Sequence, residues 1–343
     1  MHNAFLLPNT DARWMSFIEH TPSANIFHHP AWSRLIAECY HFRPQTMVLT
    51  DSQNIVVAGL PIMELPTLVS GVHWQSLPFT DHCFPLYQEK ADCDQLLSAI
   101  LESARQQRIN EVGFRGELFP NIEVHQTREY TWHMLRLEDE FTAVTARIHP
   151  MHRRNARTAE KRGVQISWGN SENDIETFYQ LHLKERHRQG IPVQPKRFFH
   201  LIGKYLFNAG LGSILFAQKD DRVIAGLLFL KFGQTLTYKF GASEKSALAN
   251  RPNDLLFWTA IQWGCENQYR FLDMGRSDPG NLGLIQFKQG WGADELPLRY
   301  FSTSHNVHGW FTGKKSDFLK NVIRNSPPWV CRFIGELFYK YAG

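Results

Sequence analysis

Positive charge gathers near the middle of the chain, in a pattern that suits the binding of phosphate. Six cationic side chains lie within residues 147–162 against one acid, so the segment carries a local charge of +5, which exceeds the +4 of the whole chain. The cations are Arg147, Arg153, Arg154, Arg157, Lys161 and Arg162, and the acid is Glu160. Arg153, Arg157 and Lys161 are four residues apart, so they share one face of a helix. One arginine guanidinium can donate two hydrogen bonds to a phosphate at once. The basic face therefore suits a phosphate-bearing substrate, either a nucleotide-linked sugar or the acceptor end of a tRNA. The alternative is a solvated basic helix that links two domains.

The chain around this cluster has the composition of an ordinary globular protein. Its 343 residues predict roughly two domains, and 43% hydrophobic residues are enough for a core. The five cysteines are odd in number, widely scattered and without a CxxC pair, which favours a reducing compartment. The first ten residues lack the pattern of a signal peptide, and no run of about eighteen apolar residues predicts a transmembrane helix. We therefore expect a cytoplasmic protein.

Two stretches of the chain repeat one order of elements. The stretches that start at His28 and Val193 each predict a Pro-led helix, an apolar strand, a polar turn and a second strand with Val-Ala-Gly or Ile-Ala-Gly. Each half continues with a helix and a strand that ends in arginine. The matching residues are Pro30 and Pro195, Gly59 and Gly226, and Arg115 and Arg276. A repeat this long indicates a duplicated domain, and chance similarity is the alternative.

The second half predicts its elements in detail. Its order is strand, two helices, three antiparallel strands, helix, strand, helix and strand. We expect strands at 164–168, 213–219, 223–232, 235–242, 270–274 and 296–302. One helix is capped by Ser171 or Asn173 and runs to His187, and another is capped by Asn253 or Asp254 and runs to Asn267; further helices are expected from Pro195 to Gly210 and at 284–289. This order predicts an α+β fold with a twisted, mostly antiparallel sheet. A ligand would enter where Thr235–Ala242 and Arg270–Met274 separate.

Four segments resemble the FemAB-like branch of the GNAT acyltransferase superfamily, especially members associated with exopolysaccharide and exosortase gene clusters. They are SLPFTDHCFPL (76–86), RRNARTAEKRGV (153–164), FYQLHLKERHRQGIPVQP (178–195) and FLDMGRSDPGNLGLIQFKQGWGADELPLRY (271–300). The resemblance covers nearly the whole chain. It implies two tandem GNAT-like domains, at 1–145 and 146–305, of which the second opens with the basic helix. A C-terminal amphipathic helical tail follows at 306–343.

The resemblance also implies an enzyme that transfers an acyl group to an amine of a cell-envelope polysaccharide or peptidoglycan precursor. The donor would be an acyl thioester such as acyl-CoA or, as the alternative, aminoacyl-tRNA, with no tightly bound cofactor. The acceptor would be a small molecule or a nucleotide-linked sugar. A coenzyme A-binding GNAT usually carries an R/QxxGxG/A loop, which the corresponding segment, GASEKSALANRPND (241–254), lacks. A third hypothesis is a non-catalytic adaptor of exopolysaccharide assembly.

Candidate catalytic residues follow from the same resemblance. Amide formation needs good geometry, a proton acceptor and a donor to the developing oxyanion. Relatives place a Phe-Lys pair near the reaction centre, so Lys288 is the first candidate for that donor. Arg276 is the second, because it lies just past a short predicted strand, at the end where a loop would face the ligand cleft. Asp273 either orients Arg276, accepts a proton or forms a buried ion pair with it. Tyr238 and Lys239 flank the expected donor channel, and alternation does not decide which of them faces the core.

A polar trio in the first half, formed by Thr80, Asp81 and His82, interrupts an apolar frame. It is either a loop that binds the acceptor or a helix cap with a surface histidine. The sixteen histidines form no HxH or HExxH pattern and have no cysteine partner, so we expect no metal site.

The tail from Trp310 to Gly343 mixes basic and apolar residues at helical spacing, among them Trp329, Phe333 and Leu337. Such a helix either lies on the inner face of the membrane as a peripheral contact or packs on the core of the protein.

Overall fold

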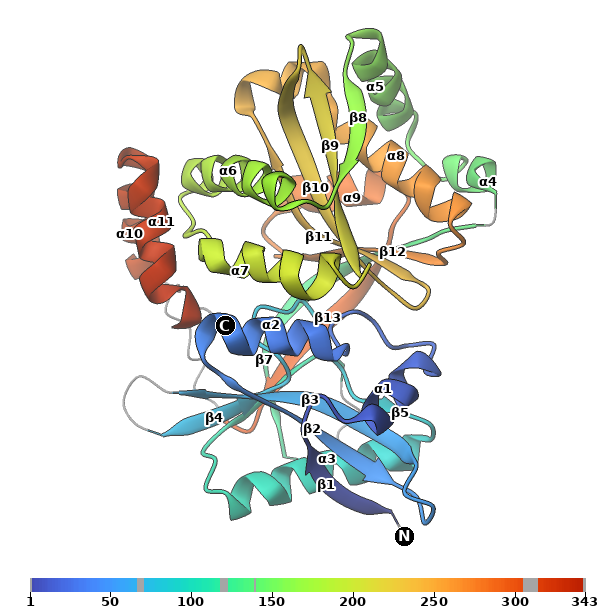
Figure 1. Cartoon of the computed structure of the whole chain (residues 1–343), viewed down its shortest axis with the longest axis vertical. Helices are drawn as coiled ribbons and strands as arrows, with labels where there is room; N and C mark the ends of the chain where they lie inside the picture. Colours follow the sequence, from blue (N-terminus) through green and yellow to red (C-terminus); the bar gives the residue numbers. More distant parts are fainter. Residues whose placement is uncertain (1, 67–70, 118–122, 139, 305–313, 342–343) are drawn as a thin grey trace. The chain divides into compact units, whose positions relative to one another are not determined.

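The computed structural model describes residues 2–66, 71–117, 123–138, 140–304 and 314–341 (Figure 1). The chain forms two compact units. Unit 1 comprises residues 1–131 and 297–308, and unit 2 comprises residues 132–296 and 309–343. The boundaries at 131/132 and 296/297 fall inside two strands, β7 (His125–Arg136) and β13 (Asp294–Ser302).

Unit 1 is built on a mostly antiparallel sheet with the strand order β1-β2-β3-β4-β6-β13. Its strands are β1 (Asn3–Leu7), β2 (Arg43–Thr50), β3 (Val56–Pro66), β4 (Val72–Gln75), β6 (Val112–Arg115) and the end of β13, with the short β5 (Leu86–Tyr87) paired to β3. Only β4 and β6 run parallel among these neighbours. The helices are α1 (Ala12–Glu19), α2 (Pro30–Tyr40) and α3 (Lys90–Gln106).

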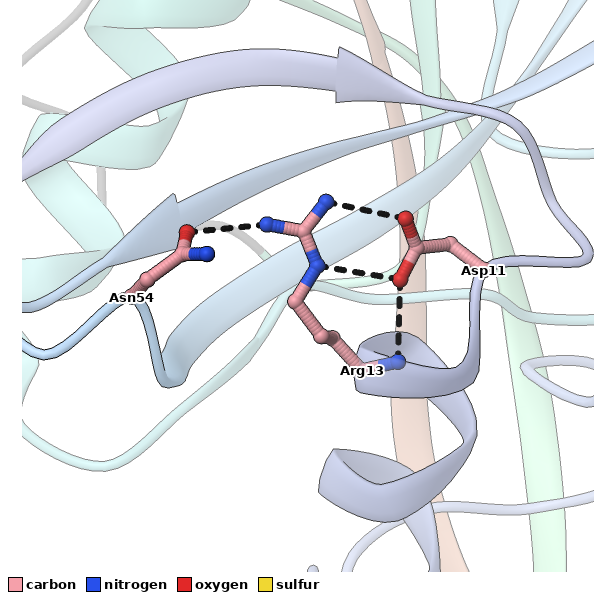
Figure 2. Close-up of polar contacts among 3 residues, drawn as sticks. All are labelled: Asp11, Arg13 and Asn54. Carbon is pink, nitrogen blue, oxygen red and sulfur yellow. Dashed lines mark hydrogen bonds and ion pairs between the residues drawn. The ribbon is translucent and has the colours of Figure 1, made fainter.

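A polar contact fixes the start of α1 in unit 1 (Figure 2). Asp11 caps the helix by accepting the backbone N–H of Arg13 at 2.9 Å. The Arg13 guanidinium donates to both carboxylate oxygens of Asp11, at 3.0 and 2.9 Å, and to Oδ1 of Asn54 at 2.8 Å. These bonds tie α1 to the turn between β2 and β3, and the bonds from Arg13 lower the pKa of Asp11.

Unit 2 repeats this architecture with the strand order β12-β11-β10-β9-β8. Its strands are β8 (Gln165–Gly169), β9 (Gly212–Lys219), β10 (Arg222–Phe232), β11 (Thr235–Ser243) and β12 (Phe271–Ser277), and β7 lies next to β12. Its helices are α4 (Phe141–Thr145), α5 (Pro150–Lys161), α6 (Glu172–Gln189), α7 (Lys196–Ile202), α8 (Pro252–Glu266) and α9 (Leu282–Gly290). A π-helical turn (Gly203–Phe207) continues α7, and a 3-10 helix (Lys245–Asn250) precedes α8. The elements predicted for the second half are present with shifted ends, but the last predicted strand, 296–302, lies mostly in unit 1, where β13 pairs with β6.

The duplication is visible in matching parts of the two units. Each has an antiparallel meander, then a helix, then a strand parallel to the last strand of the meander, namely β6 after α3 and β12 after α8. A Cβ added at Gly59 of β3 would lie 2.5 Å from the ring of Trp14 in α1, and one at Gly226 of β10 would lie 3.1 Å from the ring of Phe178 in α6. The matched glycines therefore admit an aromatic side chain from the helix that comes before α2 in unit 1 and before α7 in unit 2.

The tail forms α10 (Lys314–Asn325), α11 (Pro328–Phe338) and a last 3-10 turn (Tyr339–Tyr341), while residues 306–313 lie outside the described ranges. In Figure 1 the red tail helices lie beside α6 of unit 2. Ile323 and Cys331 are fully buried, the Arg324 guanidinium donates to the Gln189 carbonyl at 3.0 Å, and Glu336 accepts the backbone N–H of Lys196 at 3.1 Å. One face of the tail therefore packs on the core.

Candidate functional site

In unit 2, β11 and β12 pair in parallel at only three positions. The pairs are Thr235 with Phe271, Leu236 with Leu272, and Thr237 with Asp273. The register ends there, although β11 continues to Ser243 and β12 to Ser277. The strands thus separate beyond Asp273, where the sequence predicts that a ligand enters.

The strand that flanks this opening contains a β-bulge. Tyr238 is paired with Phe229 and Phe240 with Leu228, so Lys239 is the extra residue of β11. A bulge of this kind disrupts the ladder and redirects side chains, and it is common beside functional sites. Tyr238 packs against the core, with its ring centroid 5.1 Å from that of Phe257, which settles the question that alternation leaves open. The Lys239 side chain is half-buried.

Lys288 is anchored at the end of β12. It lies on α9 with a side chain only 3% exposed, and its Nζ donates to the carbonyl oxygens of Gly275 and Arg276, each at 3.0 Å. Gly275 has φ +70°, a left-handed conformation that glycine adopts without strain. This conformation occurs where the carbonyls of Gly275 and Arg276 accept hydrogen bonds from Nζ. The ammonium is therefore a fixed positive charge in a place shielded from water.

Asp273 lies two residues before Gly275 and is fully buried. Its Oδ1 accepts the indole N–H of Trp132 at 2.7 Å and the backbone N–H of Gly275 at 2.8 Å. The side chain of Arg276 is partly exposed. The structure thus brings the three predicted catalytic residues together around the end of β12, and their chemical roles stay a prediction.

No sequence motif marks His133 of β7, which interacts electrostatically with both Lys288 and Asp273. Its side chain is fully buried, and neither ring nitrogen has a hydrogen-bond partner in the described part of the chain. Burial lowers the pKa of His133 to about 4; the positive charge of Lys288 adds to this effect and the negative charge of Asp273 opposes it. The imidazole is therefore neutral at physiological pH and lies within electrostatic reach of both groups.

Two hydroxyls near the same strand ends also lack partners. Thr237 Oγ1 and Ser277 Oγ are buried without a hydrogen bond to any described residue. Folded proteins leave few buried polar atoms unpaired, and such atoms often mark a place where a substrate or water binds. With His133, they make the end of the β11–β12 pair the strongest candidate for the reaction centre in unit 2.

The predicted basic face is present on α5. The side chains of Arg153, Arg154, Arg157 and Lys161 are exposed, and none forms an ion pair within the described ranges. The opposite face of α5 buries His152, Ala156 and Ala159.

His152 connects α5 to the elements around Lys288. Its Nδ1 lies 2.6 Å from Oδ1 of Asp254 at the start of α8. Its ring stacks on Trp291, with centroids 4.4 Å apart, and meets the edge of the Phe287 ring at 5.3 Å. Phe287 is the neighbour of Lys288, so the basic helix is held by the same aromatic cluster that packs beside the candidate catalytic lysine.

The polar trio of the first half lies inside unit 1. Thr80 and His82 are each 1% exposed, and Thr80 Oγ1 accepts the indole N–H of Trp32 at 2.8 Å. The hydroxyl of Tyr300 donates to the carbonyl of Asp81 at 2.5 Å. No helix begins at these described residues, and His82 is not on the surface, so the alternative of a helix cap with a surface histidine is wrong. A role in acceptor binding stays a prediction.

No cluster of three potential metal ligands occurs within the described residues. Nor does any helix in those ranges have the length and apolar character needed to cross a membrane.

Comparisons with known proteins identify the domain and the fold that this chain shares with others. The family model described as "Acetyltransferase (GNAT) domain" matches residues 146–289, which extend from the residues just before α5 through Lys288. A UDP-N-acetylmuramoylpentapeptide-lysine N(6)-alanyltransferase from Weissella viridescens is 23% identical over 147 residues, which are 42% of this chain and 43% of that protein. The match thus spans less than half the length of this relative.

Solved structures share the whole tandem fold. The crystal structure of FemX superposes with a TM-score of 0.65 at 12% identity, covering 94% of this chain and 100% of that chain. A tandem GNAT protein from the clavulanic acid biosynthesis pathway gives 0.56 at 11% identity, covering 90% and 100%. L-PGS from Bacillus licheniformis gives 0.55 at 13% identity, covering 93% and 99%. At this identity the likeness shows the fold, and it confirms the predicted tandem GNAT-like architecture. Residues 146–289 thus match a GNAT acetyltransferase domain, and this match, the alanyltransferase relative and the FemX fold together support the predicted FemAB-like branch of the GNAT superfamily.

Proposed function

We propose that this protein transfers an aminoacyl group from aminoacyl-tRNA to an amine of a cell-envelope precursor. The observation that carries the proposal is the exposed basic face of α5, whose cations form no ion pair with any described residue and which is fixed through His152 to the elements that hold Lys288. The alanyltransferase relative supports the same reaction class, since its name states an alanyl transfer to a lysine of UDP-N-acetylmuramoyl-pentapeptide.

The loop between β11 and α8 favours tRNA over coenzyme A as the donor. It lacks the glycine-rich pattern that would hold a pyrophosphate, and a 3-10 helix occupies it. The first turn of α8 carries Asp254, whose buried carboxylate occupies a helix N-terminus that would otherwise attract a phosphate. Phosphate recognition is better served by α5, where four exposed cations have no acid paired with them among the residues that the structure describes.

The reaction is the aminolysis of an ester. The acceptor amine attacks the carbonyl carbon of the aminoacyl ester, a C–N bond forms, and the bond from that carbon to the ribose oxygen breaks. The proton that the amine loses ends on the ribose oxygen, so the products are an amide and uncharged tRNA. The buried ammonium of Lys288 stabilises the negative charge that develops on the carbonyl oxygen, because a fixed cation shielded from water acts strongly on such charge. Arg276 assists at the same strand end, and Asp273 holds the backbone turn at Gly275 in place.

Two arms test the donor. Purified protein is incubated with UDP-N-acetylmuramoyl-pentapeptide and either charged tRNA or acyl-CoA, and the acceptor is analysed by mass spectrometry. We expect transfer from charged tRNA that RNase abolishes. Transfer from acyl-CoA alone would assign the thioester reaction instead, and transfer from neither donor to this or any other envelope amine would favour a non-catalytic adaptor.

A second experiment tests the role of α5. The double variant Arg153→Gln/Arg157→Gln is expected to raise KM for tRNA about tenfold and leave kcat unchanged, because the phosphate contacts act in binding. The slope of log KM against log salt should fall by about 1.4–1.8, since each lost phosphate contact contributes about 0.7–0.9. The matched control is Arg43→Gln/Arg105→Gln, which removes the same charge from two exposed arginines of unit 1. Equal effects of the two double variants would show that α5 contributes only general charge.

A further inference from the structure

The tail helices α10 and α11 present a second apolar face that nothing in the described chain covers. Phe318 is 72% exposed, Trp329 65%, Phe333 57%, Leu337 47% and Val322 37%. These side chains lie on the same helices whose other face packs on unit 2 through Ile323 and Cys331. Packing on the core therefore accounts for only one side of the tail.

The exposed side chains form stripes and are not scattered. Phe318 and Val322 are four residues apart on α10, and Trp329, Phe333 and Leu337 are four apart on α11, so each set lies along one helix face. The described residues contain eleven large apolar side chains that are exposed, and five of them fall within residues 318–337. Single exposed apolar residues are normal, whereas a contiguous apolar patch marks an interaction site.

The charge of the tail indicates what this site contacts. Residues 314–341 contain six cations against two acids, a net charge of +4, which equals that of the entire chain. The cations are Lys314, Lys315, Lys320, Arg324, Arg332 and Lys340, and the acids are Asp317 and Glu336. Arg332 pairs with Glu336, which also accepts the backbone N–H of Lys196, and Arg324 donates to the Gln189 carbonyl. A tail that combines a net charge of +4 with a stripe of Trp, Phe and Leu matches the chemistry of an anionic lipid surface.

A second copy of the chain fits this surface less well. In a symmetric dimer the same patch faces itself, which would bring two segments of charge +4 together. We propose that the exposed face of α10 and α11 binds peripherally to an anionic lipid bilayer, with Trp329, Phe333 and Leu337 entering the boundary between headgroups and acyl chains. Unit 2 acts as the scaffold that holds the two helices. This proposal does not depend on the identity of the acyl donor.

Vesicle flotation with the full chain tests the proposal. The wild-type protein should float with vesicles of phosphatidylcholine and phosphatidylglycerol. Binding should be weaker in 0.5 M NaCl, because salt screens the attraction between the basic tail and the anionic lipid. Binding to pure phosphatidylcholine vesicles should be weaker. The variant Trp329→Ser/Phe333→Ser should lose at least about tenfold in partition coefficient, because both side chains lose apolar area that the bilayer would bury. Its melting temperature should stay unchanged, since both side chains are exposed.

The matched control is Ile55→Ser/Leu296→Ser, which removes two exposed apolar side chains elsewhere and should leave flotation unchanged. The proposal is overturned if wild type floats with neither vesicle, or if Trp329→Ser/Phe333→Ser floats as well as wild type. It is also overturned if light scattering shows a wild-type dimer that this variant dissociates, because the patch would then be an interface between copies.

Discussion

Replacing Lys288 by methionine separates the stability of this protein from its activity. Methionine keeps an unbranched side chain of similar length and removes the ammonium that donates to the carbonyls of Gly275 and Arg276. Each carbonyl that loses its donor costs about 1–3 kcal/mol where it stays buried. Against this, the substitution removes the cost of keeping an ammonium only 3% exposed, which is several kcal/mol for an ion taken out of water.

The two effects oppose each other, so we expect the free energy of unfolding of Lys288→Met to change by less than about 2 kcal/mol, or a few degrees in melting temperature. The transfer rate should fall about 10²–10³-fold, the usual effect of losing one group that stabilises an oxyanion. Thermal unfolding and steady-state transfer with saturating substrates measure the two quantities on the same preparation.

Lys231→Met is the matched control, because Lys231 is a half-buried lysine of β10 whose Nζ lies 5.6 Å from the Trp263 ring. It should leave kcat within about threefold of wild type, since it lies outside the proposed electrostatic site. If Lys288→Met retained wild-type kcat with an intact fold, the assignment of Lys288 to the reaction would be wrong.

Three further predictions concern buried groups. His133→Phe should raise the melting temperature, because it replaces an imidazole whose ring nitrogens are buried without partners in the described chain. It should also lower the transfer rate, and a variant less stable than wild type would contradict this interpretation of the site. The free energy of unfolding should fall as the pH drops from 6.5 towards 4, by up to about 1.4 kcal/mol per pH unit for each histidine whose pKa is lowered in the folded state. The reason is that these histidines bind a proton in the unfolded chain but stay neutral in the folded one. Burial lowers the pKa of His28 and His133 to about 4 and that of His182 to about 3, so urea titrations that give equal stability at pH 7 and pH 5 would refute this coupling. Gly59→Ala should cost about 1–3 kcal/mol, since its Cβ would lie 2.5 Å from an aromatic ring, whereas Gly280→Ala, with open space around its Cβ, should be near neutral in the same unfolding assay.

Much of the fold of unit 2 follows from local signals in the sequence. Ser171 and Gly190 mark the two ends of α6, where the structure shows a capping box and a left-handed C-cap. Alternating apolar residues and short polar turns define β9, β10 and β11, and the repeated half supports each assignment. These features depend on residues that are close together in the chain, so a single sequence is enough to predict them.

The parts of the site that escaped prediction depend on contacts between distant residues. His133 has no local signature, and only the packing of β7 beside β12 brings it within reach of Lys288. The contact of His152 with Asp254 joins residues 102 positions apart, and the bulge at Lys239 depends on the register with β10. Register and long-range contacts are tertiary properties, and no periodicity in a strand or helix encodes them.

Polarity alone also left two segments undecided. By sequence, His82 fits an acceptor-binding loop or a helix cap with a surface histidine, and the fold buries it. The tail has apolar residues on more than one helix face, and a sequence pattern does not reveal which face packs. Burial of Ile323 and Cys331 and exposure of Trp329 and Phe333 separate the two faces.

The proposed transfer of an amino acid from tRNA to an envelope amine can be measured directly. The protein is given a tRNA charged with an isotope-labelled amino acid together with unlabelled acyl-CoA, and the mass of the acceptor is then determined. We expect one added labelled aminoacyl residue, formed about 10²–10³-fold more slowly by Lys288→Met. An acceptor that gains only the unlabelled acyl group, or a labelled product formed equally well by Lys288→Met, would contradict it.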